Sequence, residues 1–289
     1  MLNIIFIVTC YPILFLMYFL LKNAGDRNNW CFGVTLTKEQ KKYPAIVEID
    51  ADYKKKMKSG MIVMAIVPVI TFFIPYMSIG YTIWMVWMIL VCFYPMVWYA
   101  KANMKVQDVK KRYQMPNVDD DKYWKYGLFY CNKTDKHLMV ENRMGTGTAL
   151  NMATGVAKGS YIFAIICLLI VPVSVIWMIM LDFTPIQTRV ENNTIVCQHL
   201  SVEYEIPLEN IIEYEVLNEL PEMTKMSGNG MDNVCSGTYE IYREGKVKVF
   251  FKPHNDLYIK LVTEEETYYI SGVNDDETQK LIDIIETQE

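Results

Sequence analysis

Four long stretches of this chain are apolar and contain no Asp, Glu, Lys, Arg or His. They are Asn3–Leu21, Met61–Ser78, Tyr81–Ala100 and Tyr161–Leu181. A helix needs about 20 mostly apolar residues to cross the hydrocarbon core of a bilayer, and each stretch is close to that length. The pattern therefore predicts an α-helical membrane protein with four transmembrane helices.

After the last apolar stretch the pattern changes to short strands. Apolar and polar residues alternate with a period of two in Lys246–Phe250 and Tyr258–Val262, which is typical of a strand with one buried face. Turn residues separate such segments, as in Glu191–Asn193 and Arg243–Gly245. The predicted strands are Ile186–Val190, Thr194–Gln198, Ser201–Ile206, Ile211–Val216, Thr238–Tyr242, Val247–Phe251, Leu257–Val262 and Thr267–Ser271.

The chain closes on one predicted amphipathic helix. Asn274 or Asp275 is expected to be its N-cap, because a short polar side chain there accepts a hydrogen bond from the first turn. Leu281, Ile282 and Ile285 lie on one face and form its apolar stripe.

This order of strands and helix, together with the segment Tyr204–Glu213, resembles the bacterial version of the pleckstrin-homology (PH) fold. The resemblance covers Thr184–Glu286 and implies a C-terminal β-barrel or sandwich of PH-like type, capped by one α-helix. Eukaryotic relatives often bind phosphoinositides through a basic first loop. Here the corresponding Glu191–Asn193 is not basic and the domain is acidic, which argues against that ligand.

Basic residues concentrate in two loops beside the apolar stretches, although the formal net charge is -5. Cytoplasmic loops of membrane proteins carry an excess of Lys and Arg, so both loops are predicted to be cytoplasmic and the C-terminal domain extracytoplasmic, in a multi-pass protein of the plasma membrane. The predicted organisation is transmembrane helix 1 at 1–22, a basic cytoplasmic loop at 23–60, transmembrane helices 2 and 3 at 61–100, a cytoplasmic segment with a short β-hairpin at 101–158, transmembrane helix 4 at 159–181 and the PH-like domain at 182–289.

The first basic loop contains a helix start signal. Thr37 followed by Gln40 is close to a capping box, in which the two side chains and backbones exchange hydrogen bonds. Pro44 is expected to break that helix. A second helical stretch, Ala45–Lys58, then leads into the second apolar stretch.

The second basic loop has three features of interest. The carboxylates within Asn117–Asp121 suggest either a divalent cation site or a solvated helix start, and the missing ligand repeat favours the helix start. Leu128–Cys131 and Leu138–Glu141 are predicted to pair as a hairpin. Gly145–Gly147 is predicted to be a turn rather than a phosphate-binding loop.

A second resemblance covers parts of both basic loops. The segments Trp124–Asn151 and Phe32–Leu36 resemble a short domain of unknown function found in bacterial multi-pass membrane proteins of Gram-positive type. Some relatives of that group are similar to membrane proteins of bacteriocin immunity. The group has no established chemistry, so the resemblance implies a bacterial membrane protein but no reaction.

The cysteines do not form a disulfide framework or a metal site. Cys197 and Cys235 share the C-terminal part, where a disulfide between them is one reading. Two unpaired thiols is the favoured reading, because no CxxC spacing or third ligand accompanies them.

Enzyme motifs are also missing from the sequence. His137, His199 and His254 stand apart from one another, and no metalloprotease, serine-hydrolase or Walker pattern occurs. We therefore expect a non-enzymatic protein with no cofactor and no metal. The basic clusters adjoin membrane spans, so binding of nucleic acid is not expected either.

The segment Glu219–Gly237 is predicted to be a long loop rich in Met, Gly and Asn. Loops of that length within a compact domain are usually functional or mobile. Met223, Met226 and Met231 form the candidate binding surface, because methionine adapts to varied partners, and disorder of the loop is the equal alternative.

These patterns predict an integral membrane protein whose external domain binds or senses a protein, a peptide or an envelope component. Immunity to a membrane-active peptide is one version and rests on the resemblance above. The alternative is a transporter or lipid-handling subunit. Charged residues mark most transport paths and are missing from the apolar stretches, whereas a lipid path needs no charge. The predicted partners are the lipid bilayer and a protein or peptide.

Overall fold

The computed structural model describes residues 2–27, 29–116, 119–145 and 147–287. It divides into two compact units. The first comprises Met1–Pro75 and Gly80–Pro172, and the second comprises Tyr76–Ile79 and Val173–Glu289.

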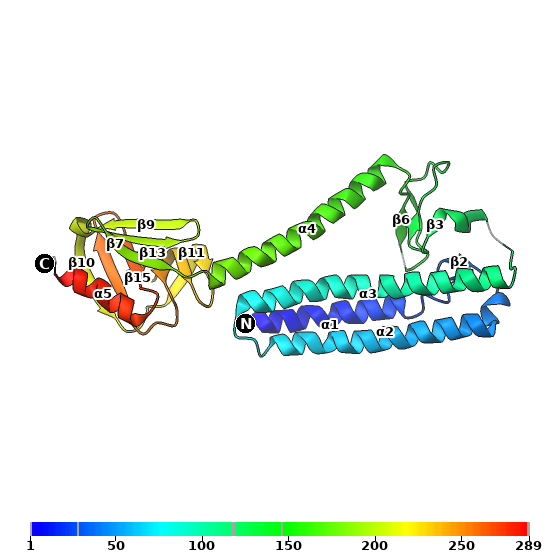
Figure 1. Cartoon of the computed structure of the whole chain (residues 1–289), viewed down its shortest axis with the longest axis horizontal. Coiled ribbons are helices and arrows are strands. Elements are labelled where there is room, and N and C mark those ends of the chain that lie inside the picture. The colour runs from blue at the N-terminus through cyan, green and yellow to red at the C-terminus, as the bar shows by residue number, and fades with distance from the viewer. Residues whose placement is uncertain (1, 28, 117–118, 146, 288–289) are drawn as a thin grey trace. The chain divides into compact units, whose positions relative to one another are not determined.

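The first unit is built on three helices that lie side by side (Figure 1). They are α1 (Leu2–Leu21), α2 (Pro44–Thr71) and α3 (Met77–Arg112). One apolar cluster joins all three, and its largest fully buried side chains include Trp87 and Tyr99 of α3. Such large aromatic side chains dominate the burial of apolar area in a core.

The predicted count of four transmembrane helices is wrong. Among the described residues, α3 and α4 (Gly155–Phe183) are long and apolar enough to cross a membrane, while the apolar helical stretch Val8–Leu21 is shorter. The predicted span Met61–Ser78 is not one helix, because α2 ends at Thr71 and α3 begins at Met77.

The helix α2 begins where the sequence indicated. Pro44 occupies its first position, where the missing N–H of proline costs no hydrogen bond. Upstream, Thr37 N donates to Gln40 Oε1 at 2.8 Å, and Gln40 N donates to Thr37 Oγ1 at 3.2 Å. This capping box precedes the short 3₁₀ helix η1 (Gln40–Lys42) and confirms the predicted start signal.

Three two-stranded pieces accompany the helices in the first unit. The predicted hairpin between 128–131 and 138–141 is wrong, because these segments pair with other partners. A left-handed turn at Tyr126 and Gly127 sends the chain back onto the strand before it. The predicted turn Gly145–Gly147 includes Thr146, which lies outside the described residues, and Gly145 and Gly147 fall between the two strands of the next hairpin. The pairs are β1 (Trp30–Cys31) with β2 (Val34–Thr35), β3 (Trp124–Lys125) with β4 (Phe129–Tyr130), and β5 (Met139–Glu141) with β6 (Thr148–Leu150).

The second unit contains two β-sheets, in agreement with the predicted sandwich. One has the strand order β7-β8-β9 and the other β10-β14-β15-β13-β12-β11, and every pair is antiparallel except β13 with β15. The strands are β7 (Gln187–Glu191), β8 (Thr194–His199), β9 (Val202–Pro207), β10 (Ile211–Leu217), β11 (Met223–Gly230), β12 (Cys235–Ile241), β13 (Gly245–Phe251), β14 (Tyr258–Thr263) and β15 (Thr267–Ile270).

The six-stranded sheet curls. Its edge strands β10 and β11 are consecutive in the chain and are joined by residues 218–222. A flat sheet of six strands would be ~24 Å wide, whereas this connection reaches at most ~20 Å. The curl encloses a cluster that includes Val249 and Tyr269, while the opposite face packs on the three-stranded sheet through Phe250 and Ile195.

The predicted strand positions agree with the structure in all eight segments, but one strand was missed. Most of the predicted loop Glu219–Gly237 is strand, because β11 and the start of β12 lie within it. Gly228 faces Gly237 across this pair, so the segment has no side-chain alternation there from which a strand could be recognised.

The final helix α5 (Asp275–Glu286) starts at Asn274, whose side chain accepts from Glu277 N at 2.9 Å. Of the two predicted N-caps, Asn274 is therefore the one used. The expectation that this helix caps a barrel is wrong. It packs alongside β14, and Leu281, Ile282 and Ile285 join the cluster between the two sheets, because that side of the sandwich needs apolar cover.

Candidate functional site

A buried ion cluster lies in the first unit around Asp121, in the 3₁₀ helix η2 (Asp119–Tyr123). Its carboxylate accepts hydrogen bonds from Thr35 N at 3.1 Å and Thr35 Oγ1 at 2.7 Å. Lys110 Nζ lies 3.0 Å from one carboxylate oxygen and Arg143 Nη1 lies 2.6 Å from the other. Both cationic side chains are 5% exposed.

The cluster is closed to further ligands. Burial would raise the pKa of Asp121, but hydrogen bonds from Thr35, Arg143 and Lys110 outweigh it and hold that pKa below its usual value. The carboxylate is thus ionised and fully engaged. The predicted helix start is found at Asp119, where η2 begins, but Asp121 is largely shielded from solvent. Asn117 and Val118 of the predicted segment lie outside the described residues. The described residues contain no group of acids, histidines or cysteines suited to a metal ion.

The ion cluster joins segments that are far apart in the sequence. Arg143 Nη1 also donates to Gly33 O at 2.7 Å, and its guanidinium lies 5.2 Å from the ring of Trp30 and 5.0 Å from that of Trp124. Cation–π contacts of this kind hold the guanidinium of Arg143 in one position. The two basic loops therefore fold into one body rather than two independent loops.

A second candidate site lies on the second unit at the edge strand β11. A cleft of about 350 Å³ opens there beside the exposed residues Met226 and Ser227. Lys246 is exposed, and Lys248 Nζ lies 3.4 Å from Thr238 Oγ1 and 3.6 Å from a Glu266 carboxylate oxygen. The lining residues are Met226, Ser227, Thr238, Lys246, Val247, Lys248 and Glu266.

The three methionines singled out from the sequence do not converge. Met226 is 52% exposed and lines the cleft. Met223 packs against the cluster inside the curled sheet, and Met231 lies in the hairpin turn, where its N–H donates to Val234 O at 3.0 Å. Their binding role stays a prediction. The cleft lysines were missed, although the alternation around Val247 placed Lys246 and Lys248 on one strand face.

Cys197 and Cys235 are both free thiols. Cys197 belongs to the cluster between the sheets, whereas Cys235 packs against the cluster inside the curled sheet. Burial raises the pKa of the Cys197 thiol to about 12, so little thiolate forms near neutral pH. This environment is typical of a structural cysteine.

The buried histidine of the second unit is His199, which is 2% exposed. Its Nε2 has no hydrogen-bond partner in the part of the chain that the structure describes. Desolvation lowers its pKa below the usual 6.5, although a backbone hydrogen bond at Thr184 opposes the shift. The folded domain therefore holds a neutral imidazole.

Acid is expected to destabilise the second unit through His199. The unfolded chain binds a proton near pH 6.5 and the folded domain binds it only at lower pH, so the free energy of unfolding falls as pH drops below about 6.5. Denaturant unfolding at pH 7.5 and 5.5 measures the loss. H199L should lose part of this pH dependence and H254L, at an exposed histidine, should keep it. Equal pH dependence in both variants would contradict the assignment.

Comparison with known proteins finds a family for part of the second unit. Residues 186–283 match a family model described as a bacterial PH domain. No curated protein and no solved structure matches the chain. The resemblance of Trp124–Asn151 to a domain of bacterial membrane proteins gains no support from these comparisons. The segment with two packed sheets and a final helix, at residues 186–283, is thus a bacterial PH domain.

Proposed function

We propose that this protein is a non-enzymatic membrane protein whose PH domain binds an extended segment of a protein or peptide partner. The observation that carries the proposal is the open edge of β11, the last strand of the six-stranded sheet. An edge strand has unpaired N–H and C=O groups that can pair with an added strand. The cleft beside it offers a pocket for a side chain of that segment.

Membrane attachment is supported by α3 and α4, the two helices with the length and composition of a span. In α4 no residue of the most apolar window is buried among the described residues, as expected of a helix surrounded by lipid. The PH domain follows within a few residues, since β7 begins at Gln187. The domain would therefore be held close to the membrane surface.

The side of the membrane follows from charge. The contacts of Asp121 with Thr35 and of Arg143 with Gly33 join both basic loops, which supports placing both on one side, and the positive-inside rule favours the cytoplasmic side. If α3 and α4 both span, the PH domain lies on the other side of the plasma membrane. A partner would then be an envelope protein or a peptide that reaches the membrane from outside, and immunity to such a peptide is one version.

The charge of the cleft favours a carboxylate on the partner. Lys246 is exposed there and Lys248 shares its positive charge with Glu266. The rest of the domain is acidic, including Glu264, Glu265 and Asp275–Glu277. An anionic membrane surface would be repelled by most of this domain, whereas a short segment with one acidic side chain fits the local charge.

Site-specific photocrosslinking in cells tests this surface. A photoreactive amino acid at Met226 should give a discrete adduct, because this exposed side chain borders the cleft. The same probe at Tyr242, which is 84% exposed in a turn, should give none. Loss of the lysine charge in K246Q should reduce the Met226 adduct by roughly fivefold, in line with ~1 kcal/mol for a favourable charge pair.

The result would contradict the proposal in two cases. One is equal adduct formation at Met226 and Tyr242, which indicates random collision. The other is an adduct at Met226 that consists of lipid, which indicates that the domain faces the bilayer itself. K280Q, at an exposed lysine of α5, is the matched control and should leave the adduct unchanged.

A further inference from the structure

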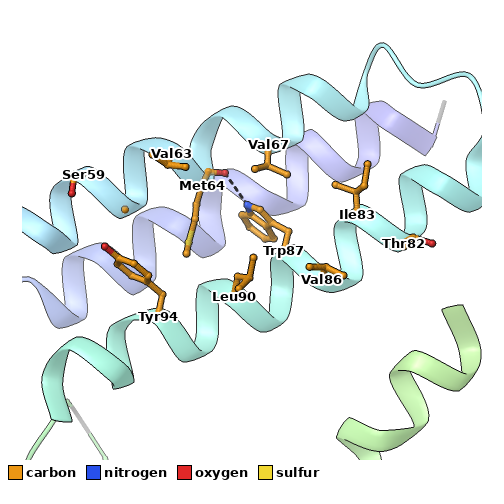
Figure 2. Close-up of a pocket in the computed structure, with 11 residues that line it drawn as sticks. Ser59, Val63, Met64, Val67, Thr82, Ile83, Val86, Trp87, Leu90 and Tyr94 are labelled. Atoms are coloured by element: carbon orange, nitrogen blue, oxygen red, sulfur yellow. Dashed lines mark hydrogen bonds between the residues drawn. The ribbon is translucent and has the colours of Figure 1, made fainter. Parts of the chain in front are cut away.

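An apolar groove of about 510 Å³ runs between α2 and α3 in the first unit (Figure 2). Its floor contains Met64 and the buried Trp87, whose indole N–H donates to Met64 O at 2.8 Å. This hydrogen bond pairs the indole N–H, which is the polar group of the Trp87 side chain. Val63 of α2 and Leu90 of α3 stand on the two sides and are 62% and 53% exposed. The groove is therefore open to its surroundings and almost wholly apolar.

The length of the groove matches the depth of one membrane leaflet. Its lining on α3 runs from Thr82 to Tyr94. At 1.5 Å per residue this is ~18 Å. Half of the hydrocarbon core of a bilayer is ~15 Å. An extended acyl chain of one leaflet would thus lie along most of the groove.

One end of the groove carries polar groups and leads to a basic region. Ser59, Gly60 and Tyr94 line one end, where the Tyr94 hydroxyl donates to Lys56 O at 2.8 Å. A Cβ on Gly60 would lie 2.2 Å from the Tyr94 ring, so the glycine permits this close packing. Beyond Tyr94 along α3, Trp98 follows about one helical turn later. Trp is enriched where membrane meets water.

Positive charge gathers beyond this end. Lys56 Nζ lies 4.2 Å and Lys101 Nζ lies 4.5 Å from the centroid of the Trp98 ring. Asp52 pairs with Lys56 at 2.9 Å and with Lys105 at 3.2 Å. Lys56 and Lys105 therefore share one carboxylate and Lys101 adds a third ammonium group, so the excess positive charge suits a phosphate.

We propose that this groove binds one acyl chain of an anionic phospholipid, with the headgroup at Lys56 and Lys101. The proposal rests on the membrane location proposed above. A helix is an unsuitable occupant, since a cylinder 10 Å wide and 18 Å long fills ~1,400 Å³, well above the volume of the groove. A single chain needs no larger space, and the basic end selects an anionic headgroup over a zwitterionic one.

The test uses the full-length protein in lipid nanodiscs with phosphatidylglycerol that carries a photoreactive group on its acyl chain. Mass spectrometry should place most adducts on groove residues, notably Val63, Val67 and Leu90. Phosphatidylcholine with the same labelled chain should give about fivefold fewer, as should K101Q, because a lysine near an anionic lipid contributes roughly that factor. K58Q, at an exposed lysine of α2, should leave the yield unchanged.

A second pair of variants separates the groove from the general lipid-facing surface. V63W places a bulky side chain in the groove and should reduce the adduct yield at Val67 and Leu90 severalfold. I62W is the matched control, because Ile62 is 55% exposed on the same helix and does not line the groove. Adducts spread evenly over Ile62 and Val63, or adducts that fall on α4 instead of Val67 and Leu90, would overturn the proposal.

Extraction of membranes with alkaline carbonate comes first. Protein released by carbonate would refute the membrane location and with it the proposed function. Protein that stays in the membrane but shows evenly distributed adducts would refute the groove alone.

Discussion

We expect D121N to lower the free energy of unfolding of the first unit by about 3–5 kcal/mol, the usual cost of breaking a buried ion pair. The amide removes the negative charge and leaves Lys110 and Arg143 buried without a counter-ion. The Asn amide also points its own N–H₂ donor group at the donor groups that surround residue 121. Chemical unfolding of the detergent-solubilised protein, followed by tryptophan fluorescence, measures the loss, because Trp30 and Trp124 flank Arg143.

The neighbouring carboxylate provides the control. D120N should change the stability by less than about 0.5 kcal/mol, because Asp120 is exposed. A similar loss in D120N and D121N, or no loss in D121N, would contradict a stabilising role of the ion cluster.

The pH dependence of this effect has a defined sign. The pKa of folded Asp121 lies below the usual 3.8, so its contribution is fully present above that value. It disappears as the pH falls through the lower, folded pKa, where the carboxylate becomes protonated. The difference between the wild-type protein and D121N should therefore be constant near neutral pH and shrink only in strong acid.

The second large effect is expected from G237A in the PH domain. Gly237 has a φ of +128°, and a Cβ there would lie 2.3 Å from Ser227 O and 2.7 Å from Gly228 Cα. Backbone strain and the clash together should cost about 3–5 kcal/mol. The edge strand β11 would separate from β12, and the candidate binding surface would be lost with it.

Limited proteolysis of the full-length protein measures this separation, since cleavage within 223–234 requires an open β11. G245A is the matched control, because Gly245 also has a positive φ, of +89°, but a Cβ there meets nothing within 4 Å. Its cost should be about 1–2 kcal/mol. Equal proteolysis of the two variants would show that the close approach of Gly228 and Gly237 leaves room for a side chain.

Much of the PH domain could be predicted from local pattern, and the failures there have a physical cause. Strands such as β13 alternate apolar and polar residues because one face is buried, and Asn274 caps α5 through a hydrogen bond three residues away. The strand β11 was missed because its side chains are largely exposed and glycine replaces side-chain alternation. Its position depends on pairing with β12, and the residues of β11 alone carry no sign of that pairing.

The candidate sites were harder to predict than the strands. Met226 was singled out because methionine adapts to varied partners, and its binding role stays a prediction. Lys246 and Lys248 were not singled out, because their place in a cleft depends on Thr238 and Glu266, which come from other segments. The groove was not foreseen at all, because it requires α2 and α3 to lie side by side. The sequence showed the apolar character of those helices and did not show which faces leave a space between them.

By itself, the sequence determined most of the helical segments and strands, and the separation of charge between the basic loops and the acidic C-terminal domain. These depend on residues within a few positions of one another. The tertiary structure alone decided that Thr35, Lys110 and Arg143 meet at Asp121 and that the six-stranded sheet curls. Thr35 and Asp121 are 86 residues apart. A contact over that distance forms when packing of many other segments lowers the free energy, so no local pattern contains it.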